Sequence, residues 1–323
     1  MHIFNSLESL KEFFGGAEFY MALGNFDGVH LGHQKLIEGV VSSARNRRQV
    51  SVVVTFDPHP SQYFAKVGDF KKIDSPSIRR RLLAQLHVDA MLELKFDKTL
   101  AGTSARDFLD GLTSSASVRQ ICVGTDFRFG RDRQGDANFL KEFCADKSIE
   151  CTTVEPVHVE GVVASSSQVR LWLRDGRVDL AYKMLGRPFA LTGTVVEGNK
   201  LGRSIGFPTA NLDHMEQLIP GTGVYAGFLT VKSDISAELR GVDQMRAVVN
   251  VGVRPTLNLQ DKGVTVEAHV YDRTQGDLDF YGQTVELTFC ARLRDEKKFQ
   301  DVTDLRDQIQ RDVDMAKSKS NFC

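Results

Sequence analysis

The spacing of apolar and polar positions changes once along the chain, near residue 186. From residue 19 to about residue 174, short apolar runs rich in β-branched residues alternate with segments of helical period. This alternation is typical of a parallel sheet covered by helices on both faces. The pattern predicts strands at residues 19–23, 50–56, 90–96, 120–123 and 149–154, and helices that include residues 36–44 and 78–86.

After residue 186 the helical period disappears, and short alternating strands broken by glycine and proline continue to residue 293. We expect a small antiparallel barrel there. In one of its strands, five apolar side chains fall on one face: Val285, Leu287, Phe289, Ala291 and Leu293. A last apolar stripe at residues 302–316 predicts a closing helix, capped by Asp301 or Thr303, that packs on the barrel.

Length and composition limit the class of protein. A chain of 323 residues favours two domains, which we place at residues 1–185 and 186–323. The net charge is −1 with both signs mixed, so we expect small-molecule substrates rather than nucleic acid or an anionic membrane surface. The five cysteines include no C-x-x-C pair and are odd in number, which argues against a disulfide framework or a zinc site. The same cysteine pattern implies a reducing cytoplasm. The sequence shows no apolar leader and no run of transmembrane length, so we expect no targeting to a membrane. We expect a monomer or a weak homo-oligomer.

The first candidate site is the segment A-L-G-N-F-D-G-V-H-L-G-H at residues 22–33, which follows the first predicted strand and begins the first helix. In an open α/β sheet, ligands bind beyond the carboxyl ends of the strands, and a helix N-terminus offers free N–H groups to a phosphate. His30 and His33 are separated by Leu31 and Gly32, so both imidazoles can point at one anion and stabilise a phosphate under attack. Surface histidines and metal ligands are the alternatives, although no third ligand lies at metal-site spacing.

Three serines, Ser165, Ser166 and Ser167, open a later helix that also carries Arg170. Serine hydroxyls suit an N-cap, so capping alone is one interpretation. The other is that the hydroxyls, the helix N–H groups and Arg170 hold the β- and γ-phosphates that leave as pyrophosphate.

A second candidate site follows the first strand of the predicted barrel. Gly198, Gly202 and Gly206 form a flexible turn in which backbone amides can approach a phosphate, although glycines alone also mark an ordinary hairpin. The turn is not a Walker A loop, because no G-K-[ST] follows. Thr209 and Asn211 then place a hydroxyl and an amide oxygen on one side of an extended chain, and such oxygens suit Mg²⁺ beside ATP phosphates.

A carboxylate further along the chain is the candidate base. If Val266 and Ala268 face the barrel core, Glu267 faces the other way, where it can take the proton of an attacking hydroxyl. A strand glutamate that is simply solvated is the alternative interpretation.

Eight segments together resemble one family. The first four are G-N-F-D-G-V-H-L-G-H at 24–33, T-F-D-P-H-P at 55–60, G-T-D-F-R-F-G at 124–130 and S-S-S-Q-V-R at 165–170. The last four are G-N-K-L-G-R-S-I-G-F-P-T-A-N at 198–211, G-V-Y-A-G at 223–227, N-V-G-V-R-P-T at 250–256 and V-E-A-H at 266–269. They resemble, in order, the adenylyltransferase and kinase modules of prokaryotic bifunctional riboflavin kinase/FAD synthetases, over nearly the whole chain.

The resemblance implies a nucleotidyltransferase-type parallel α/β sheet, then a riboflavin-kinase β-barrel with a C-terminal helix, acting on riboflavin, FMN and ATP with Mg²⁺. The residues it implies around ATP in the first module are Gly24, Asn25, Phe26, His30, His33, Ser165, Ser166, Ser167 and Arg170. The residues it implies near the flavin there are Phe56, His59, Pro60, Asp126, Phe127 and Arg128. The ATP site it implies in the kinase module is Gly198, Gly202, Arg203, Gly206, Pro208, Thr209 and Asn211.

Within the kinase module, the resemblance implies Thr209 and Asn211 as magnesium ligands and Glu267 as the base that acts on the ribityl 5′-hydroxyl of riboflavin. Three residues depart from the family pattern: Ser167 replaces a usual threonine, Ala164 a larger aliphatic residue and Arg79 a common lysine. These departures keep the hydroxyls and positive charges, so they affect only the details of nucleotide binding.

Two other functions stay open at this point. One module could have lost its activity and only bind flavin, or the whole chain could be a non-catalytic flavin or nucleotide carrier. Both motif sets are intact, which disfavours the first alternative. Incubation with riboflavin, ATP and Mg²⁺, followed by chromatographic separation of FMN from FAD, distinguishes the three.

Overall fold

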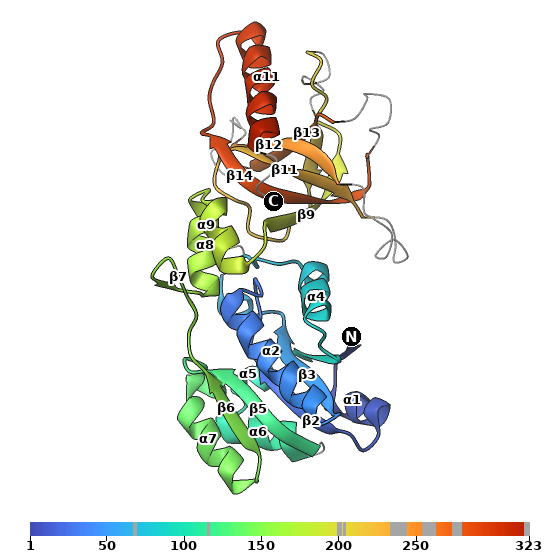
Figure 1. The fold of residues 1–323 in the computed structure, drawn as a ribbon, viewed down its shortest axis with the longest axis vertical. Helices are drawn as coiled ribbons and strands as arrows, with labels where there is room; N and C mark the ends of the chain where they lie inside the picture. The colour runs from blue at the N-terminus through green and yellow to red at the C-terminus, as the bar shows by residue number, and fades with distance from the viewer. Residues whose placement is uncertain are drawn as a thin grey trace. The chain divides into compact units, whose positions relative to one another are not determined.

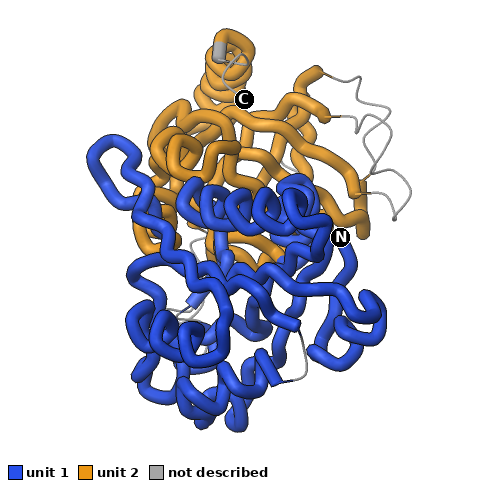
Figure 2. The backbone as a smooth tube through the Cα atoms, turned by 60° about the horizontal axis from the view of Figure 1, so that its bottom comes forward, with its two compact units in different colours: residues 1–72, 76–165 blue, residues 73–75, 166–323 orange. Residues whose placement is uncertain are grey.

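The computed structural model describes residues 1–66, 70–114, 117–198, 202, 205–232, 244–253, 263–272 and 280–319. The chain forms two compact units, coloured separately in Figure 2 and drawn as ribbons in Figure 1. Unit 1 comprises Met1–Lys72 and Pro76–Ser165, and unit 2 comprises Ile73–Ser75 and Ser166–Cys323. Residues 166–185 therefore group with unit 2, while the division into functional domains at residues 185 and 186 stays a prediction.

Unit 1 is built on a six-stranded sheet in the order β1-β4-β3-β2-β5-β6, with every neighbouring pair parallel. Its strands are β1 (His2–Phe4), β2 (Glu18–Leu23), β3 (Val50–Asp57), β4 (Ala90–Lys95), β5 (Ser117–Gly124) and β6 (Glu150–Val154). All five predicted strands are present, so the expected parallel α/β fold is confirmed. Strand β1 was missed because three residues show no period, and only its pairing with β4 makes it a strand.

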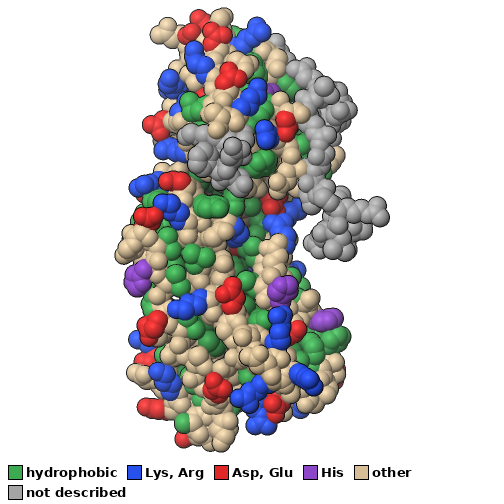
Figure 3. All heavy atoms as spheres, in the orientation of Figure 1, with side chains coloured by type: hydrophobic (Ala, Val, Ile, Leu, Met, Phe, Trp, Pro, Cys, Tyr) green, Lys and Arg blue, Asp and Glu red, His purple; other side chains and the backbone are tan. Residues whose placement is uncertain are grey.

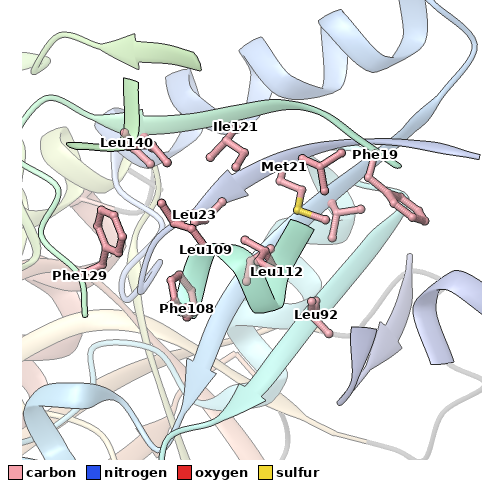
Figure 4. Close-up of a cluster of buried hydrophobic side chains, with 14 of the residues drawn as sticks. Phe19, Met21, Leu23, Leu92, Phe108, Leu109, Leu112, Ile121, Phe129 and Leu140 are labelled. Carbon is pink, nitrogen blue, oxygen red and sulfur yellow. The ribbon is translucent and has the colours of Figure 1, made fainter. Parts of the chain in front are cut away.

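Helices cover both faces of this sheet. The helical segments of unit 1 are α1 (Leu7–Phe14), α2 (Leu31–Asn46), α3 (Pro60–Phe64), α4 (Pro76–Gln85), α5 (Lys98–Gly102), α6 (Ala105–Ser114), η1 (Arg131–Arg133) and α7 (Ala137–Asp146). A short hairpin, β7 (His158–Val159) and β8 (Val162–Val163), precedes the end of the unit. Met21 and Leu23 of β2 pack with α6 and α7 on one face (Figure 4), whereas Tyr20 and Ala22 pack with α2 on the other. Two buried faces explain why the strands read as continuous apolar runs.

Unit 2 contains a closed barrel of six strands in the order β10-β13-β12-β11-β14-β9, paired antiparallel throughout. The strands are β9 (Phe189–Val196), β10 (Ala210–Asp213), β11 (Gly223–Val231), β12 (Met245–Val253), β13 (Val264–Val270) and β14 (Thr284–Arg294). Tyr225, Phe189 and Phe289 are fully buried inside it, with the ring centroids of Tyr225 and Phe289 5.4 Å apart. The predicted antiparallel barrel is confirmed.

The predicted alternation in the last strand holds only in part. Val285, Leu287 and Phe289 are buried, as expected. The register between β11 and β14 shifts after Ala226 and again after Val224, which are β-bulges or similar irregularities. Each shift moves the following side chains to the opposite face of the strand. Leu293 consequently packs under the C-terminal helix with Val224 and Ala226, not with the barrel interior.

The closing helix α11 (Val302–Lys319) packs on the barrel as predicted, through Val313 and Ala316. Asp301 is its cap, because the Asp301 carboxylate accepts a hydrogen bond of 2.8 Å from the Asp304 N–H. Arg294 at the end of β14 donates two hydrogen bonds, of 2.8 and 2.6 Å, to the buried Asp312 carboxylate. This bidentate pair fixes the helix to the strand.

Two further helices and a three-residue segment belong to the described part of unit 2. Helices α8 (Ser166–Arg174) and α9 (Val178–Leu185) precede the barrel, and α9 contacts β9 and β14. Arg187 donates to both oxygens of the fully buried Asp74 carboxylate at 2.6 and 2.9 Å. The Gln217 side chain donates to the Ile73 carbonyl at 2.8 Å and accepts a bond from the Thr192 N–H at 2.8 Å. Residues 73–75 are thus held by the barrel unit through buried polar contacts.

The surface charge, the helices and the cysteines bear on three further expectations from the sequence. On the face shown in Figure 3, basic and acidic side chains are interspersed. Within the described ranges, no helix is long and apolar enough to cross a membrane. Cys122, Cys144 and Cys151 are free thiols, whereas Cys290 is disulfide-bonded and is therefore an exception to the expectation from the cysteine count.

A pair of fragments tests how much of unit 2 the barrel needs. Residues 166–323 keep α9, whose Val178, Met184 and Leu185 are fully buried, and residues 186–323 lose it. Burial of each large apolar side chain contributes about 1.5–3 kcal/mol, and a whole domain is stable by only about 5–15 kcal/mol. We expect the longer fragment to unfold at a clearly higher urea concentration by circular dichroism. Equal urea midpoints for the two fragments would show that the barrel does not need residues 166–185 for its stability.

Candidate functional site

The turn between β2 and α2 is anchored on the neighbouring strand β3. The Gly24 N–H donates to the Val54 carbonyl at 3.2 Å, and the Thr55 hydroxyl donates to the Asn25 carbonyl at 3.1 Å. A Cβ at Gly24 would lie 3.0 Å from the ring of Phe26, which explains the glycine there. Phe26 itself is fully buried and has a positive φ of 49°. Such backbone conformations persist only where the surrounding structure holds them, and they concentrate at ligand sites.

His30 and His33 form one stacked pair at the start of α2. His30 is the N-cap residue, and its Nδ1 accepts a hydrogen bond of 3.4 Å from the His33 N–H. The two ring centroids are 3.6 Å apart with an interplanar angle of 22°. A Cβ at Gly32 would lie 3.1 Å from the His30 ring, so the glycine between the histidines makes room for the stack. The two predicted histidines are therefore brought together.

Both histidines are held in the neutral form. Burial lowers the pKa of His30 to about 4. Burial, and then the proximity of His30 and His59, lowers the pKa of His33 well below its ordinary value. The His33 Nδ1 atom is inaccessible and has no hydrogen-bond partner. At neutral pH the pair can offer hydrogen bonds to a phosphate but adds no positive charge.

The chain that leads into the three serines lies against this turn. The Ala164 carbonyl is 3.5 Å from the point where a Cβ of Gly32 would stand, and the Ala164 N–H donates to the Val157 carbonyl at 2.7 Å. Ser165 ends unit 1, whereas Ser166, Ser167 and Arg170 begin unit 2 as part of α8. The approach of Ser166, Ser167 and Arg170 to the histidines stays a prediction.

The residues expected near the flavin fall into two groups. Phe56 is buried in the core, and its ring packs with those of Phe96 and Phe108. Phe127 is half-buried and stacks on Phe129, with centroids 5.4 Å apart. Phe56 is thus a core side chain with little free ring surface.

The polar members of the flavin set lie at the surface or beside the histidines. Asp126 and Arg128 are exposed, and Arg128 pairs with Asp136 at 3.1 Å. Pro60 begins α3 directly after His59, whose buried ring stacks on Phe70 with centroids 4.6 Å apart.

Sequence reasoning missed two aromatic residues of α3. Tyr63 is 39% and Phe64 is 70% exposed, and both rings contact Phe96. They stand at the carboxyl end of β3, where exposed aromatic faces can stack on a planar ligand. The sequence signal that could have identified them is the aromatic pair Tyr63 and Phe64, which follows shortly after His59 and Pro60.

A row of polar side chains crosses the barrel in unit 2. Asn211 of β10 is paired with Glu267 of β13, which is in turn paired with Asn250 of β12. Directly paired residues share a face, and the flanking Val266 and Ala268 are buried inside the barrel. The predicted orientation of Glu267 away from the core is confirmed. Asn250 was not singled out, although it opens the N-V-G-V-R-P-T segment.

The glycine turn folds back onto this row. A Cβ at Gly198 would overlap the side-chain amide of Asn211, and a Cβ at Gly202 would overlap the Phe207 carbonyl. Gly206 has a positive φ of 88°. Close backbone approach explains Gly198 and Gly202, and the positive φ explains Gly206, so the glycines have more specific roles than those of an ordinary hairpin. Arg203 lies outside the described residues.

Beside the turn, a histidine and a hydroxyl complete the local geometry. The Pro208 carbonyl lies 2.9 Å from the His269 Nδ1, which must carry the hydrogen because a carbonyl only accepts. Burial lowers the pKa of His269. Across the described residues no group of three or more His, Cys, Asp or Glu could hold a metal. Mg²⁺ takes few protein oxygens and keeps water and phosphate ligands, and the half-buried Thr209 and Asn211 offer such oxygens.

Comparisons with known proteins match both halves of the chain. A family model described as FAD synthetase matches residues 16–168, and one described as riboflavin kinase matches residues 185–320. Bifunctional riboflavin kinase/FMN adenylyltransferase of Escherichia coli K12 is 35% identical, covering 90% of each chain. The enzyme of the same name from Bacillus subtilis 168 is 32% identical, covering 97% of this chain and 95% of the relative. A solved structure described as a macrolide-efflux protein from Streptococcus pneumoniae is similar with a TM-score of 0.82 and 30% identity, covering 95% of this chain and 96% of that one.

The buried histidine pair predicts a pH dependence of stability. The pKa of His30 falls from 6.5 to about 4 on folding, so the unfolded chain binds this proton more tightly between these values. The stability that the neutral ring contributes is therefore present above pH 6.5 and is lost as the pH falls towards 4, by roughly 3 kcal/mol at most. We expect His30→Gln to lessen the loss of unfolding free energy across this window, measured in urea by circular dichroism. His158→Gln, in the exposed hairpin, should keep the parental dependence, and an equal slope in all three proteins would contradict a neutral buried His30.

Proposed function

Because this chain belongs to the family of bifunctional riboflavin kinase/FMN adenylyltransferases, we propose how its residues divide the two reactions. The protein phosphorylates riboflavin to FMN with ATP, and it transfers AMP from ATP to FMN, which gives FAD and pyrophosphate. Both steps use ATP and Mg²⁺. One observation supports this division of the two reactions: each family model covers one set of motifs. The stacked histidines lie in the first matched region, and the paired Asn211 and Glu267 lie in the second.

In adenylyl transfer, a phosphate oxygen of FMN attacks the α-phosphorus of ATP, and the bond to the leaving pyrophosphate breaks. The free N–H groups at the start of α2 face the negative charge that develops there, and Gly24, Asn25 and Phe26 shape the turn that admits the nucleotide. His30 and His33 act as neutral hydrogen-bond donors to the α-phosphate, preorganised by their stack. The inaccessible and unpartnered His33 Nδ1 supports a polar ligand at this point.

The remaining groups of the first module complete the proposal. Ser165, Ser166, Ser167 and Arg170 hold the departing pyrophosphate through hydroxyl and guanidinium hydrogen bonds. The residues that we propose to contact the flavin are His59, Pro60, Asp126, Phe127 and Arg128. Phe56 is buried, and we propose that it supports this site from the core. The exposed rings of Tyr63 and Phe64 support an aromatic surface near His59.

In the kinase reaction, Glu267 takes the proton of the ribityl 5′-hydroxyl as that oxygen attacks the γ-phosphorus. Thr209 and Asn211 would hold Mg²⁺, which supplies charge stabilisation on the phosphate oxygens. Gly198, Gly202, Gly206 and Pro208 let the turn close over the phosphates, and Arg203 is proposed to add a cation there. The pairing of Asn211 with Glu267 places the proposed base and metal ligand on adjacent strands.

The cellular setting is also a proposal. We place the protein in the cytoplasm as a monomer or a weak homo-oligomer that acts on riboflavin, FMN and ATP. The mixed surface charge and the free thiols of Cys122, Cys144 and Cys151 support this setting. Sedimentation at micromolar concentration measures the oligomeric state, and a stable high-order assembly would contradict it.

The first assay separates the three functions considered for the chain. Protein is incubated with riboflavin, ATP and Mg²⁺, and the flavins are separated by chromatography. We expect FMN to appear first and FAD to follow. Accumulation of FMN without FAD would indicate a silent first module, and unchanged riboflavin would indicate a carrier.

We expect His30→Ala to remove most FAD formation while FMN formation continues, because the ring serves only the turn of unit 1. Loss of one preorganised donor costs about 10² to 10³ in rate in comparable sites. The measurement is FAD production from supplied FMN, with kinase turnover in the same sample as the internal control. His158→Ala is the matched surface control, and parental FAD production by His30→Ala would remove His30 from the site.

We expect Glu267→Gln to lower riboflavin phosphorylation by about 10² or more, because the amide keeps the size of the side chain but cannot accept the proton. AMP transfer to supplied FMN should stay nearly parental. Asp314→Asn, an exposed carboxylate on α11, is the control for a lost negative charge. Parental phosphorylation by Glu267→Gln would exclude Glu267 as the base, and loss of both activities would show general misfolding.

A further inference from the structure

A charged triad lies buried in unit 1 and has no part in the mechanism above. Arg79 of α4 is 3% exposed and donates through Nη2 to Oε1 of Glu93 on β4. Arg80 donates through Nη2 to the other oxygen, Oε2, at 2.8 Å. Both oxygens of one carboxylate thus have a guanidinium partner, and the triad keeps one net positive charge.

Stability alone does not explain the triad. Burial of an ion pair is often no better than apolar packing of the same volume, because desolvation offsets the attraction. Arg79 stands between Ile78 and Leu83, which are both fully buried in apolar surroundings. The Nε atoms of Arg79 and Arg80 are also inaccessible and make no hydrogen bond in the described part of the chain. The arrangement carries a folding cost that a functional role would explain.

The triad lies beside the turn that we assign to the nucleotide. Glu93 is paired with Thr55 across β4 and β3, and the Thr55 hydroxyl holds the Asn25 carbonyl at 3.1 Å. Both side chains lie on the face of the sheet that α2 covers, because Val53 and Met91, two residues earlier on each strand, pack there. With adjacent strands about 5 Å apart, the carboxylate is within roughly 10 Å of the turn.

A cation near the turn would favour binding of an anionic nucleotide. ATP brings several negative charges to the site. His30 and His33 are neutral in the free protein, so they add none of the balancing charge. Asp57 at the end of β3 is paired with Lys72 at 2.7 Å, which leaves that neighbouring pair without net charge.

We propose that Arg79, Glu93 and Arg80 form a buried positioning triad whose net positive charge favours binding of the ATP phosphates at the turn of residues 24–33. The inference rests on the proposed placement of the nucleotide there. Arg79 fixes the carboxylate, and Arg80 supplies the unbalanced charge. Arg79 and Glu93 are buried, whereas 42% of the Arg80 side chain is exposed, so solvent and salt screen part of its charge.

The test changes the charge of the triad in both directions in the full chain. Arg80 is the tolerant position, because 42% of its side chain is exposed. Arg80→Gln removes the net charge, and we expect it to raise the KM for ATP in adenylyl transfer about three- to tenfold, with kcat within about twofold. Arg80→Lys keeps the charge and should restore the parental KM. Glu93→Gln leaves two unbalanced cations and should lower the KM for ATP, a change of opposite sign that general damage cannot produce.

Two controls fix the interpretation. Arg45→Gln removes an exposed positive charge at the far end of α2 and should leave the KM unchanged. The KM for ATP of the kinase reaction should stay parental in every variant. If Arg80→Gln leaves the adenylyl-transfer KM parental, or if Arg80→Gln and Glu93→Gln both raise it, the triad is only structural and the proposal is overturned. His30→Ala separates this outcome from failure of the site itself, because parental FAD formation in that variant would displace the nucleotide from the turn.

Discussion

The anchoring of the β2–α2 turn on strand β3 is the constraint on which the first site depends. Thr55 and the Val54 carbonyl hold Asn25 and Gly24 at the carboxyl edge of the sheet. A parallel sheet brings all its strand ends to that edge, so the turn, α3 and the end of β4 share one region. The start of α2, with its free N–H groups, is thereby fixed where an anion can be bound.

This anchoring also explains the unusual state of the histidines. Phe26 packs beneath the turn and contacts the His33 ring edge-on, with centroids 5.2 Å apart. Gly32 then lets the His30 ring stack on that of His33. The burial that orders the two rings also removes their charge. In our proposal, the neutral rings of His30 and His33 donate hydrogen bonds to the phosphate, and the positive charge that balances the nucleotide comes from the triad of Arg79, Glu93 and Arg80.

The barrel meets a different physical demand. Large side chains such as Tyr225 and Phe289 fill its interior, and the polar residues that we propose for the kinase reaction lie on the outer face. On that face α11 covers the apolar residues Val224 and Val248. The row of Asn211, Glu267 and Asn250 lies on β10, β13 and β12 and is only half-buried. Close backbone approach at Gly198 brings the glycine turn to that row.

The sequence determined the main architecture and most of the candidate chemistry. The helical and strand periods of apolar residues, 3.6 and 2, depend only on residues close in sequence. They therefore predicted the sheet, the barrel and the closing helix. The spacing of His30 and His33 placed two rings on one helix start, and alternation turned Glu267 away from the barrel core. These features need no knowledge of distant contacts.

Tertiary structure alone decided the rest, because each remaining feature depends on residues far apart in sequence. Three residues become β1 only through pairing with residues 90–92, and the register shifts of β14 exist only against β11. The neutrality of His30 comes from the burial around it, which no local pattern records. The sequence marks Arg79 only as a positive charge at a family position where lysine is common, and gives it no partner. Only the packing of α4 on β4, which sets both Arg79 and Arg80 against Glu93, makes it a buried partner in a charged triad.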